Sequence, residues 1–272
     1  GDGFEDNDDR NEVGVMATGI INPHALAAAP NTAYRDAVLA DNPLSLWMMD
    51  EPYGNNVATD QGTSPSDGSY VGALATSSTQ RGSRTIFGLD AIGNATTGIK
   101  GGYVNCPMNT TMRNALSKTY SNFNLTFEFL INVDQLTSFN NLIFDNWLPW
   151  YFKTLTGGRL DTRWYSAPGA IVYVFCPTSQ RSTGTDYHVV IRVTSGITTV
   201  RFDYYLNGVA KNNQTFNGFP GMGGAYPVGS AFKAGGVSTG ANDVGVYGGL
   251  AGVAFYDYSL SGAQIIAHYN AL

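Results

Sequence analysis

Residues 123–132, FNLTFEFLIN, decide the fold class of this 272-residue chain. Apolar residues occupy every second position of the stretch, namely Phe123, Leu125, Phe127, Phe129 and Ile131. Because successive side chains of a strand point to opposite faces, a period of two indicates a strand with one buried face. The stretch therefore predicts a long, half-buried strand, with Glu128 on its outward face among Asn and Thr residues.

The same alternation returns further along the chain. Residues 187–194 and 200–206 each carry four apolar residues at alternate positions. The second stretch ends at Asn207-Gly208, a dipeptide that favours a two-residue hairpin because both turn positions need positive φ. Residues 209–216 are the expected return strand. Further strands are expected over 150–155 and 160–164, joined by a turn at 156–158, and over 252–257.

Short helices are expected on either side of the strands. Residues 32–40 place Tyr34, Val38 and Leu39 on one stripe, and Asp41-Asn42-Pro43 ends the helix. Near the other end, Ser261 and Gln264 form a capping box, and Ile265, Tyr269 and Leu272 share a face. No alternation of strands and helices appears in between. The chain is therefore predicted to be all-β, with two packed antiparallel sheets in one domain over residues 31–272.

Residues 1–30 are predicted to form an extended N-terminal arm. The formal net charge is −6, and residues 1–12 alone hold six acids and one base. Residues 13–30 are apolar without a clear period and contain two prolines. We expect an arm that docks on a basic patch of a neighbouring subunit; the alternative is a solvated tail. A pI near 4.9 argues against nucleic acid as the main partner.

No apolar run reaches the roughly 18–20 residues of a membrane helix, so membrane insertion is not expected. The start is acidic and lacks the basic-then-apolar pattern of a secretory signal, which leaves the compartment open.

The two cysteines, Cys106 and Cys176, are too few for a disulfide framework or a zinc site. We expect two free thiols, with pairing as the alternative.

From Tyr34 to Leu272 the chain resembles the concanavalin A-like jelly-roll domains of the laminin-G-like type, which are common in bacterial surface proteins and bacteriophage virion proteins. The resemblance is carried by residues 34–51 (YRDAVLADNPLSLWMMDE) with Asp60-Gln-Gly62 and Gly68, by residues 187–191 with 205–209, and by residues 249–265 (GLAGVAFYDYSLSGAQI). It implies a jelly-roll sandwich with Trp47 as a core anchor.

Many members of the family also hold a structural calcium ion with an acidic residue before the last strand. Here those positions are Leu250, Ala251 and Gly252. We expect no cofactor; the alternative is a calcium ion held by Asp50, Glu51 and Asp60, since hard cations take several carboxylate oxygens.

The residues of a catalytic site are missing from the sequence. Jelly-roll glycosidases need a pair of carboxylates, about 5–5.5 Å apart in retaining enzymes. The chain has four glutamates (Glu5, Glu12, Glu51 and Glu128) and no Glu-x-Asp-x-x-Glu motif. The three histidines, His24, His188 and His268, fall in three separate elements and are expected to be ordinary surface residues. We therefore predict that the protein is not an enzyme.

Aromatic residues gather where a sugar could bind. Trp147, Trp150, Tyr151, Trp164 and Tyr165 fall within 19 residues, with Asp161 and Arg163 among them. Sugars stack their C–H faces on aromatic rings, while charged and amide groups hold the hydroxyls. Neighbouring rings alternate sides, so at least one ring of each pair leaves the inter-sheet core. These residues form a candidate carbohydrate site; the alternative is that the outward rings pack under a loop or the arm.

Together these features predict a non-enzymatic bacteriophage virion protein, either a head or tail decoration or a fibre component. Its lectin-like domain would face outward and bind a host-surface glycan. Its arm would anchor it, as an oligomer, to other virion proteins. The alternative is a secreted or cell-surface bacterial carbohydrate-binding module, and a polysaccharide-degrading enzyme is a distant third candidate.

Overall fold

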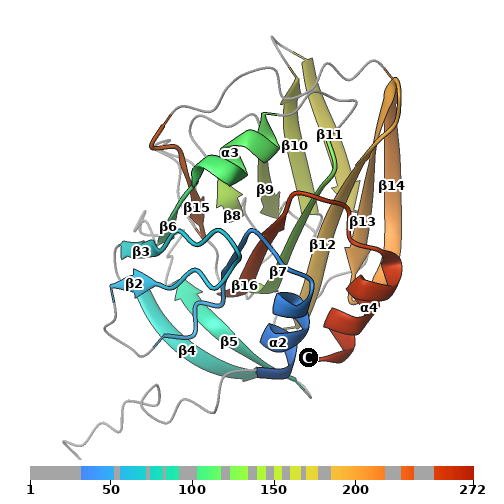
Figure 1. The fold of residues 1–272 in the computed structure, drawn as a ribbon. Coiled ribbons are helices and arrows are strands. Elements are labelled where there is room, and N and C mark those ends of the chain that lie inside the picture. The colour runs from blue at the N-terminus through green and yellow to red at the C-terminus, as the bar shows by residue number, and fades with distance from the viewer. Residues whose placement is uncertain are drawn as a thin grey trace, which may run out of the picture.

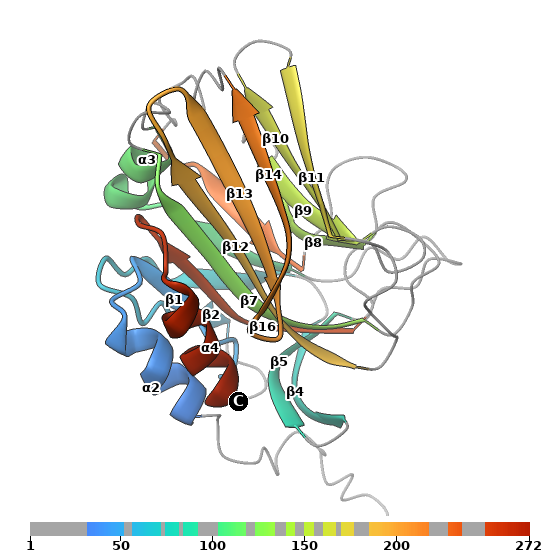
Figure 2. The same ribbon diagram turned by 90° about the vertical axis from the view of Figure 1, so that its right-hand side faces the viewer.

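The computed structural model describes residues 32–51, 56–71, 74–81, 84–91, 103–117, 123–133, 140–144, 150–154, 160–166, 170–176, 185–217, 228–235 and 248–272. The predicted arm over residues 1–30 lies outside this set. Figures 1 and 2 show two sheets packed face to face, with helices against the outside of one of them.

Each sheet has eight strands, and their pairings are antiparallel. The first sheet runs in the order β14-β13-β12-β7-β16-β5-β4, and β1 also pairs with β16. Its strands are β1 (Ser45–Trp47), β4 (Leu74–Arg81), β5 (Arg84–Ala91), β7 (Leu125–Val133), β12 (Asp186–Ser195), β13 (Thr199–Leu206), β14 (Val209–Asn217) and β16 (Gly248–Tyr256).

The second sheet runs in the order β11-β10-β9-β8-β15-β6-β3-β2. Its strands are β2 (Val57–Ala58), β3 (Gly68–Val71), β6 (Tyr103–Pro107), β8 (Asn140–Phe144), β9 (Trp150–Thr154), β10 (Leu160–Ser166), β11 (Ala170–Cys176) and β15 (Ala231–Ala234). The predicted two-sheet antiparallel sandwich is confirmed.

The alternating residues of β7, β12 and β13 fill the space between the sheets. All five apolar residues that predicted the β7 strand are buried there, from Phe123 to Ile131. Trp47 of the first sheet meets Phe232 of the second edge to face, with their ring centres 5.3 Å apart. Trp47 is fully buried, which confirms it as a core anchor. Cys106 is also buried here as a free thiol.

The turn between β13 and β14 has the predicted form. Asn207 and Gly208 have φ of 53° and 72°, as a two-residue hairpin with both centres in the left-handed region requires. The space beside Gly208 is also occupied, because a Cβ built there would lie 3.1 Å from Cδ1 of Tyr269. Both the turn and the neighbouring helix therefore favour glycine at this position.

Three helices are described rather than the two expected. α2 (Thr32–Ala40) and α4 (Gly262–Asn270) match the predicted segments, and the capping box of Ser261 and Gln264 is present. The additional helix, α3 (Thr110–Leu116), begins after Asn109, whose side chain accepts a hydrogen bond from the N–H of Met112. None of the described helices is long and apolar enough to cross a membrane.

A second apolar cluster lies on the outer face of the first sheet. Tyr34 and Val38 of α2, and Ile265 of α4, pack there against Leu130 of β7 and Val190 of β12. Figure 2 shows the two helices side by side against this face. The face that β7 was expected to turn to solvent is therefore covered, and the first sheet is buried on both sides along β7 and β16.

Candidate functional site

The strands β9 and β10 bring part of the predicted carbohydrate site together. Their register places Trp150 opposite Trp164 and Tyr151 opposite Arg163. Backbone alternation puts positions 150, 162 and 164 on one face of the pair and positions 151, 161, 163 and 165 on the other. We call this pair of strands the β9–β10 ladder.

The two faces of the ladder differ in what they carry. Thr162, on the face that carries the two tryptophan positions, is buried. The opposite face collects Tyr151, Asp161, Arg163 and Tyr165, which are two aromatic and two charged residues at neighbouring backbone positions. Trp147 lies outside the described residues. The carbohydrate site stays a prediction, and the register gathers four of its seven residues on one face.

Asp60, one of the three predicted calcium ligands, holds backbone amides. Its Oδ1 accepts hydrogen bonds from the N–H groups of Leu46 at 2.8 Å and Gly62 at 2.9 Å. Its Oδ2 accepts from the N–H of Ser66 at 2.8 Å. Burial raises the pKa of Asp60, while these backbone N–H groups oppose the rise. The carboxylate thus ties β1 to the turn of residues 60–66 that follows β2.

The other two predicted ligands lie beside this turn. Glu51 accepts from the backbone N–H of Thr59 at 2.5 Å and from the hydroxyl of Tyr70. Burial and the charge of Glu51 raise the pKa of Asp50. Hydrogen bonds to protein donors thus occupy acceptor positions of Asp60 and Glu51, and the calcium site stays a prediction. Within the described ranges, no group of three or more His, Cys, Asp or Glu residues is placed to hold a metal ion.

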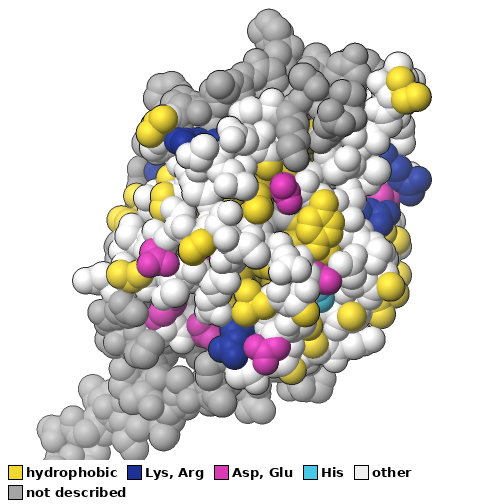
Figure 3. All heavy atoms as spheres, viewed as in Figure 1, with side chains coloured by type: hydrophobic (Ala, Val, Ile, Leu, Met, Phe, Trp, Pro, Cys, Tyr) yellow, Lys and Arg dark blue, Asp and Glu magenta, His cyan; other side chains and the backbone are white. Residues whose placement is uncertain are grey.

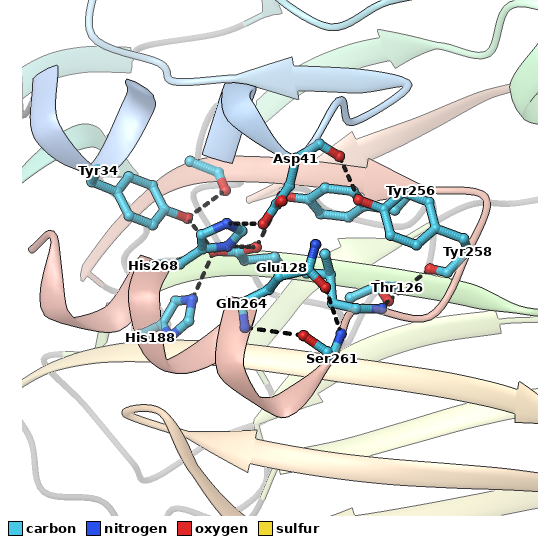
Figure 4. Close-up of polar contacts among 12 residues, drawn as sticks. Tyr34, Asp41, Thr126, Glu128, His188, Tyr256, Tyr258, Ser261, Gln264 and His268 are labelled. Carbon is cyan, nitrogen blue, oxygen red and sulfur yellow. Dashed lines mark hydrogen bonds and ion pairs between the residues drawn. The ribbon is translucent and has the colours of Figure 1, made fainter. Parts of the chain in front are cut away.

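A buried polar cluster on the outer face of the first sheet was missed by sequence reasoning. We call it the Glu128 cluster, and it consists of Tyr34, Asp41, Glu128, His188, Tyr256 and His268 (Figure 4). Glu128 of β7 was predicted to face outward, which it does, but it is fully buried beneath the helices. The prediction that His188 and His268 are surface residues is wrong, since each is only 1% exposed. His24 lies outside the described residues.

Four side chains converge on the Glu128 carboxylate. Oε1 accepts from the hydroxyl of Tyr34 at 3.0 Å and lies 2.7 Å from Nε2 of His188. Oε2 accepts from the hydroxyl of Tyr256 at 3.2 Å and lies 3.0 Å from Nδ1 of His268. Burial alone would raise the pKa of Glu128, but the two histidines beside it outweigh that effect and lower the pKa.

His268 lies between two carboxylates. Its Nδ1 faces Glu128, and its Nε2 lies 2.9 Å from Oδ2 of Asp41 at the end of α2. Since carboxylates accept and do not donate, both ring nitrogens are donors and the ring is an imidazolium. Burial opposes this charge, but the hydrogen bonds and charges of Glu128 and Asp41 prevail and raise the pKa of His268.

His188 is held differently from His268. Its Nε2 lies 2.7 Å from Oε1 of Glu128, whereas its buried Nδ1 has no hydrogen-bond partner among the described residues. His188 therefore meets the cluster through a single ring nitrogen, while His268 bridges two carboxylates.

The groups of the Glu128 cluster are those of acid–base catalysis, but their burial excludes that use in this arrangement. Glu128 and the two tyrosines are fully buried, and burial and the charge of Glu128 raise the pKa of both tyrosines, which stay neutral donors. No reactant can come within hydrogen-bonding reach of a carboxylate enclosed in this way. The cluster instead fastens α2 and α4 to the sheet.

Solved structures with the same fold include binding domains of bacterial toxins. One is of botulinum neurotoxin type C, which enters cells by interacting with two ganglioside molecules; it has a TM-score of 0.60 and 12% identity over 85% of this chain. Another is the botulinum neurotoxin serotype D ligand-binding domain in complex with N-acetylneuraminic acid, with a TM-score of 0.51 and 13% identity over 86% of this chain. This chain covers only 52% of each of them, and at such identity the likeness establishes the fold.

No curated protein matches the sequence. Residues 99–266, more than half of the chain, match the concanavalin A-like lectin/glucanase superfamily through its laminin-G-like type. The matched range runs from β6 into α4 and includes β7, the β9–β10 ladder and the hairpin at Asn207-Gly208. By its sequence and by the lectin-like jelly roll that this sequence forms, the chain belongs to the concanavalin A-like lectin/glucanase superfamily.

Proposed function

We propose that the protein binds carbohydrate and has no catalytic activity of its own. The observation that carries the proposal is the register of the β9–β10 ladder. It places Tyr151, Asp161, Arg163 and Tyr165 on one face of a lectin-like sandwich. The first and last of these residues supply rings on which the C–H face of a sugar stacks, and the other two supply charged groups that hold its hydroxyls.

Two further observations support this proposal. The related toxin structures are of proteins that interact with gangliosides or hold N-acetylneuraminic acid, so the fold suits carbohydrate ligands. The only glutamate of the described core, Glu128, is enclosed by protein donors, and Asp41, the other carboxylate of its cluster, lies on the far side of the His268 ring, so the two do not flank an open site of the kind that glycoside hydrolysis requires. Binding without bond cleavage is therefore the function that the described residues favour.

A glycan array followed by titration calorimetry tests the proposal. Tyr151→Ala and Tyr165→Ala test one face of the ladder, and Trp150→Ala and Trp164→Ala test the other. We expect the two tyrosine variants to weaken binding of the best glycan by about tenfold or more, equivalent to about 1.4 kcal/mol. Ile197→Ala, at an exposed turn between β12 and β13, is the matched control. Wild-type affinity in both tyrosine variants would refute this face of the ladder as the binding site, and a loss in the tryptophan variants alone would place the sugar on the other face.

We further propose that the protein is displayed on a bacteriophage particle and that residues 1–30 anchor it to other virion proteins as an oligomer. The separation of charge in the sequence supports this, since residues 1–12 hold six acids and one base while the remaining 260 residues hold 15 acids and 14 bases. Mass spectrometry of purified particles tests the location. Recovery of the protein from a bacterial cell-wall or culture fraction instead would favour the alternative, a surface or secreted carbohydrate-binding module.

A further inference from the structure

Six polar residues form a regular array on the outer face of β12, β13 and β14, beyond the part that the helices cover. Arg201 of β13 pairs with Thr194 of β12 on one side and Thr215 of β14 on the other. Two residues along, Asp203 pairs with Arg192 and Asn213 in the same way. The residues between them, such as Val193 and Phe202, are buried in the inter-sheet core, so this array faces away from it. We call the six residues the polar platform.

Arg192 and Asp203 form the fixed base of the platform. Oδ2 of Asp203 lies 3.1 Å from Nε and 2.7 Å from Nη2 of Arg192. The remaining terminal nitrogen, Nη1, donates to the carbonyl of Leu260 at 3.1 Å. The guanidinium also lies over the ring of Tyr205, 5.2 Å from its centre. These contacts use all the donor nitrogens of Arg192 and leave Asp203 only 4% exposed.

Arg201 is held differently. Its Nε donates to Oδ1 of Asp203 at 2.7 Å, yet 52% of its side chain is exposed. Within the described part of the chain, its two terminal nitrogens make no further contact. A guanidinium anchored through Nε has its orientation set and presents the other two nitrogens as a fork, the geometry that binds a carboxylate through two parallel hydrogen bonds.

The surroundings of Arg201 combine positive charge with neutral hydrogen-bonding groups. Figure 3 shows Lys and Arg side chains gathered around an acidic group at the edge formed by β13 and β14. Lys211 is exposed on β14, so the platform and this lysine carry three cations against the single charge of Asp203. Thr215 and Asn213 are exposed beside the fork, and Thr194 on the other side donates to Ser259 at 3.2 Å.

From this geometry we propose that the polar platform binds the carboxylate of an acidic glycan, with Arg201 as the carboxylate receptor and Thr215 and Asn213 as partners for sugar hydroxyls. The proposal rests on the proposed carbohydrate function and adds to it a second site, on the other sheet from the β9–β10 ladder, for uronic or sialic acids. Neighbouring strands lie about 4.7–4.9 Å apart, so the groups beside Arg201 are within reach of hydroxyls on the same sugar ring. A ligand with hydroxyls around one carboxylate fits this array better than a run of carboxylates.

The test compares acidic sugars with matched neutral ones in the full chain. The probes are trigalacturonic acid against its methyl ester, and sialyllactose against lactose, measured by titration calorimetry. We expect the acidic member of at least one pair to bind about tenfold more tightly, and Arg201→Gln to abolish that preference while leaving the neutral member unchanged. Arg201→Lys should restore only part of the preference, because an ammonium cannot reproduce the fork. Arg35→Gln, on α2, makes the same change of charge elsewhere and should have no effect.

The outcomes separate this proposal from the proposed function. Arg201→Gln keeps the contacts of Arg192 with Asp203, and an unchanged melting temperature would show that this variant folds. Thr215→Val is a second variant, which keeps every charge and should weaken binding of the acidic sugar. Neutral glycans that bind while acidic ones show no dependence on Arg201 would overturn the platform alone. No binding of any glycan would overturn both. A peptide of residues 1–12 is the last probe. If it binds wild type more tightly than any acidic sugar does, and if Arg201→Gln abolishes this binding, the platform is a docking site for the chain's own acidic segment and the proposal fails.

Discussion

Nδ1 of His268 lies 3.0 Å from Oε2 of Glu128, and both side chains are buried, so the last helix is joined to the central strands of the first sheet by an ion pair without direct contact with water. Removal of one partner from a buried pair of this kind strongly lowers the free energy of unfolding, because it leaves the other partner charged and desolvated. The stability of the domain should therefore depend on this pair and on its neighbours.

Glu128→Gln should strongly destabilise the domain. The substitution keeps the shape of the side chain but removes the charge that faces His268, and it places amide hydrogens near donors. We expect a loss of about 3–5 kcal/mol in the free energy of unfolding, measured by urea denaturation. Asp36→Asn, which removes an exposed carboxylate on α2, should change it by less than about 0.5 kcal/mol. Equal effects of the two variants would contradict a structural role for Glu128.

The contribution of His268 should depend on pH. Its pKa is raised in the folded state, so its contribution is complete below its unfolded pKa of about 6.5 and is lost as the pH rises through the folded value. The lowered pKa of Glu128 acts at the other end: its contribution is present above about pH 4.3 and is lost only as the pH falls through the folded value. Asp41, His188, Tyr34 and Tyr256 are the other titratable groups of the cluster.

Urea unfolding of wild type and His268→Gln over about pH 5 to 9 measures this dependence. The difference in stability between the two proteins should be largest between about pH 4.3 and 6.5 and should shrink as the pH rises further. A tenfold difference in proton affinity between the folded and unfolded states corresponds to about 1.4 kcal/mol of stability. A difference that grows with pH would mean that His268 is neutral in the folded protein.

Gly252→Ala should displace α2. Gly252 has φ of 56°, and a Cβ there would lie 2.8 Å from Cε1 of Tyr34. Both the left-handed backbone and the clash are unfavourable, so we expect a loss of about 2–4 kcal/mol in the free energy of unfolding. Gly262→Ala is the matched control, since nothing lies within 4 Å of its Cβ position at the start of α4. That variant should be neutral or more stable by up to about 1 kcal/mol.

Asp60→Ala tests the link between β1 and the turn of residues 60–66. The change leaves the backbone N–H groups of Leu46, Gly62 and Ser66 without their acceptor, and we expect a loss of about 2–4 kcal/mol in the free energy of unfolding. Since the carboxylate oxygens face these donors, neither calcium nor EDTA should change the melting temperature of wild type. A clear rise with calcium that disappears in Asp60→Ala would instead support the metal site that the family resemblance suggested.

Much of the sandwich could be predicted because its signals are local. The period of two in β7, β12 and β13 follows directly from strand geometry, and Asn207-Gly208 fixes a turn type through φ alone. α3 was not predicted, because its seven residues give less than two full turns of periodic pattern. The strands β9 and β10 were predicted, but the pairing of Trp150 with Trp164 depends on a register that the turn between them does not reveal.

The Glu128 cluster could not be predicted because its members are distant in sequence and come from two helices and three strands. One signal was present: Leu130 lies on the face of β7 that was expected to be polar, and each terminal helix has an apolar stripe that needs a surface to cover. Together they indicate that the helices cover this face. The burial of His188 and His268 then follows from the place where the helices dock, which no local pattern specifies.

α2 and α4 lie beside each other on one face of the sandwich and meet through the contact of Asp41 with His268. The described domain therefore begins and closes at the same place, although its first and last residues are far apart in sequence. A segment joined to either end of the described domain would attach on this side, so a single attachment point could hold the domain with its other faces exposed. A circular permutant that links residue 272 to residue 32 through a short flexible peptide should fold, and new ends could be opened at the exposed turn around Ile197.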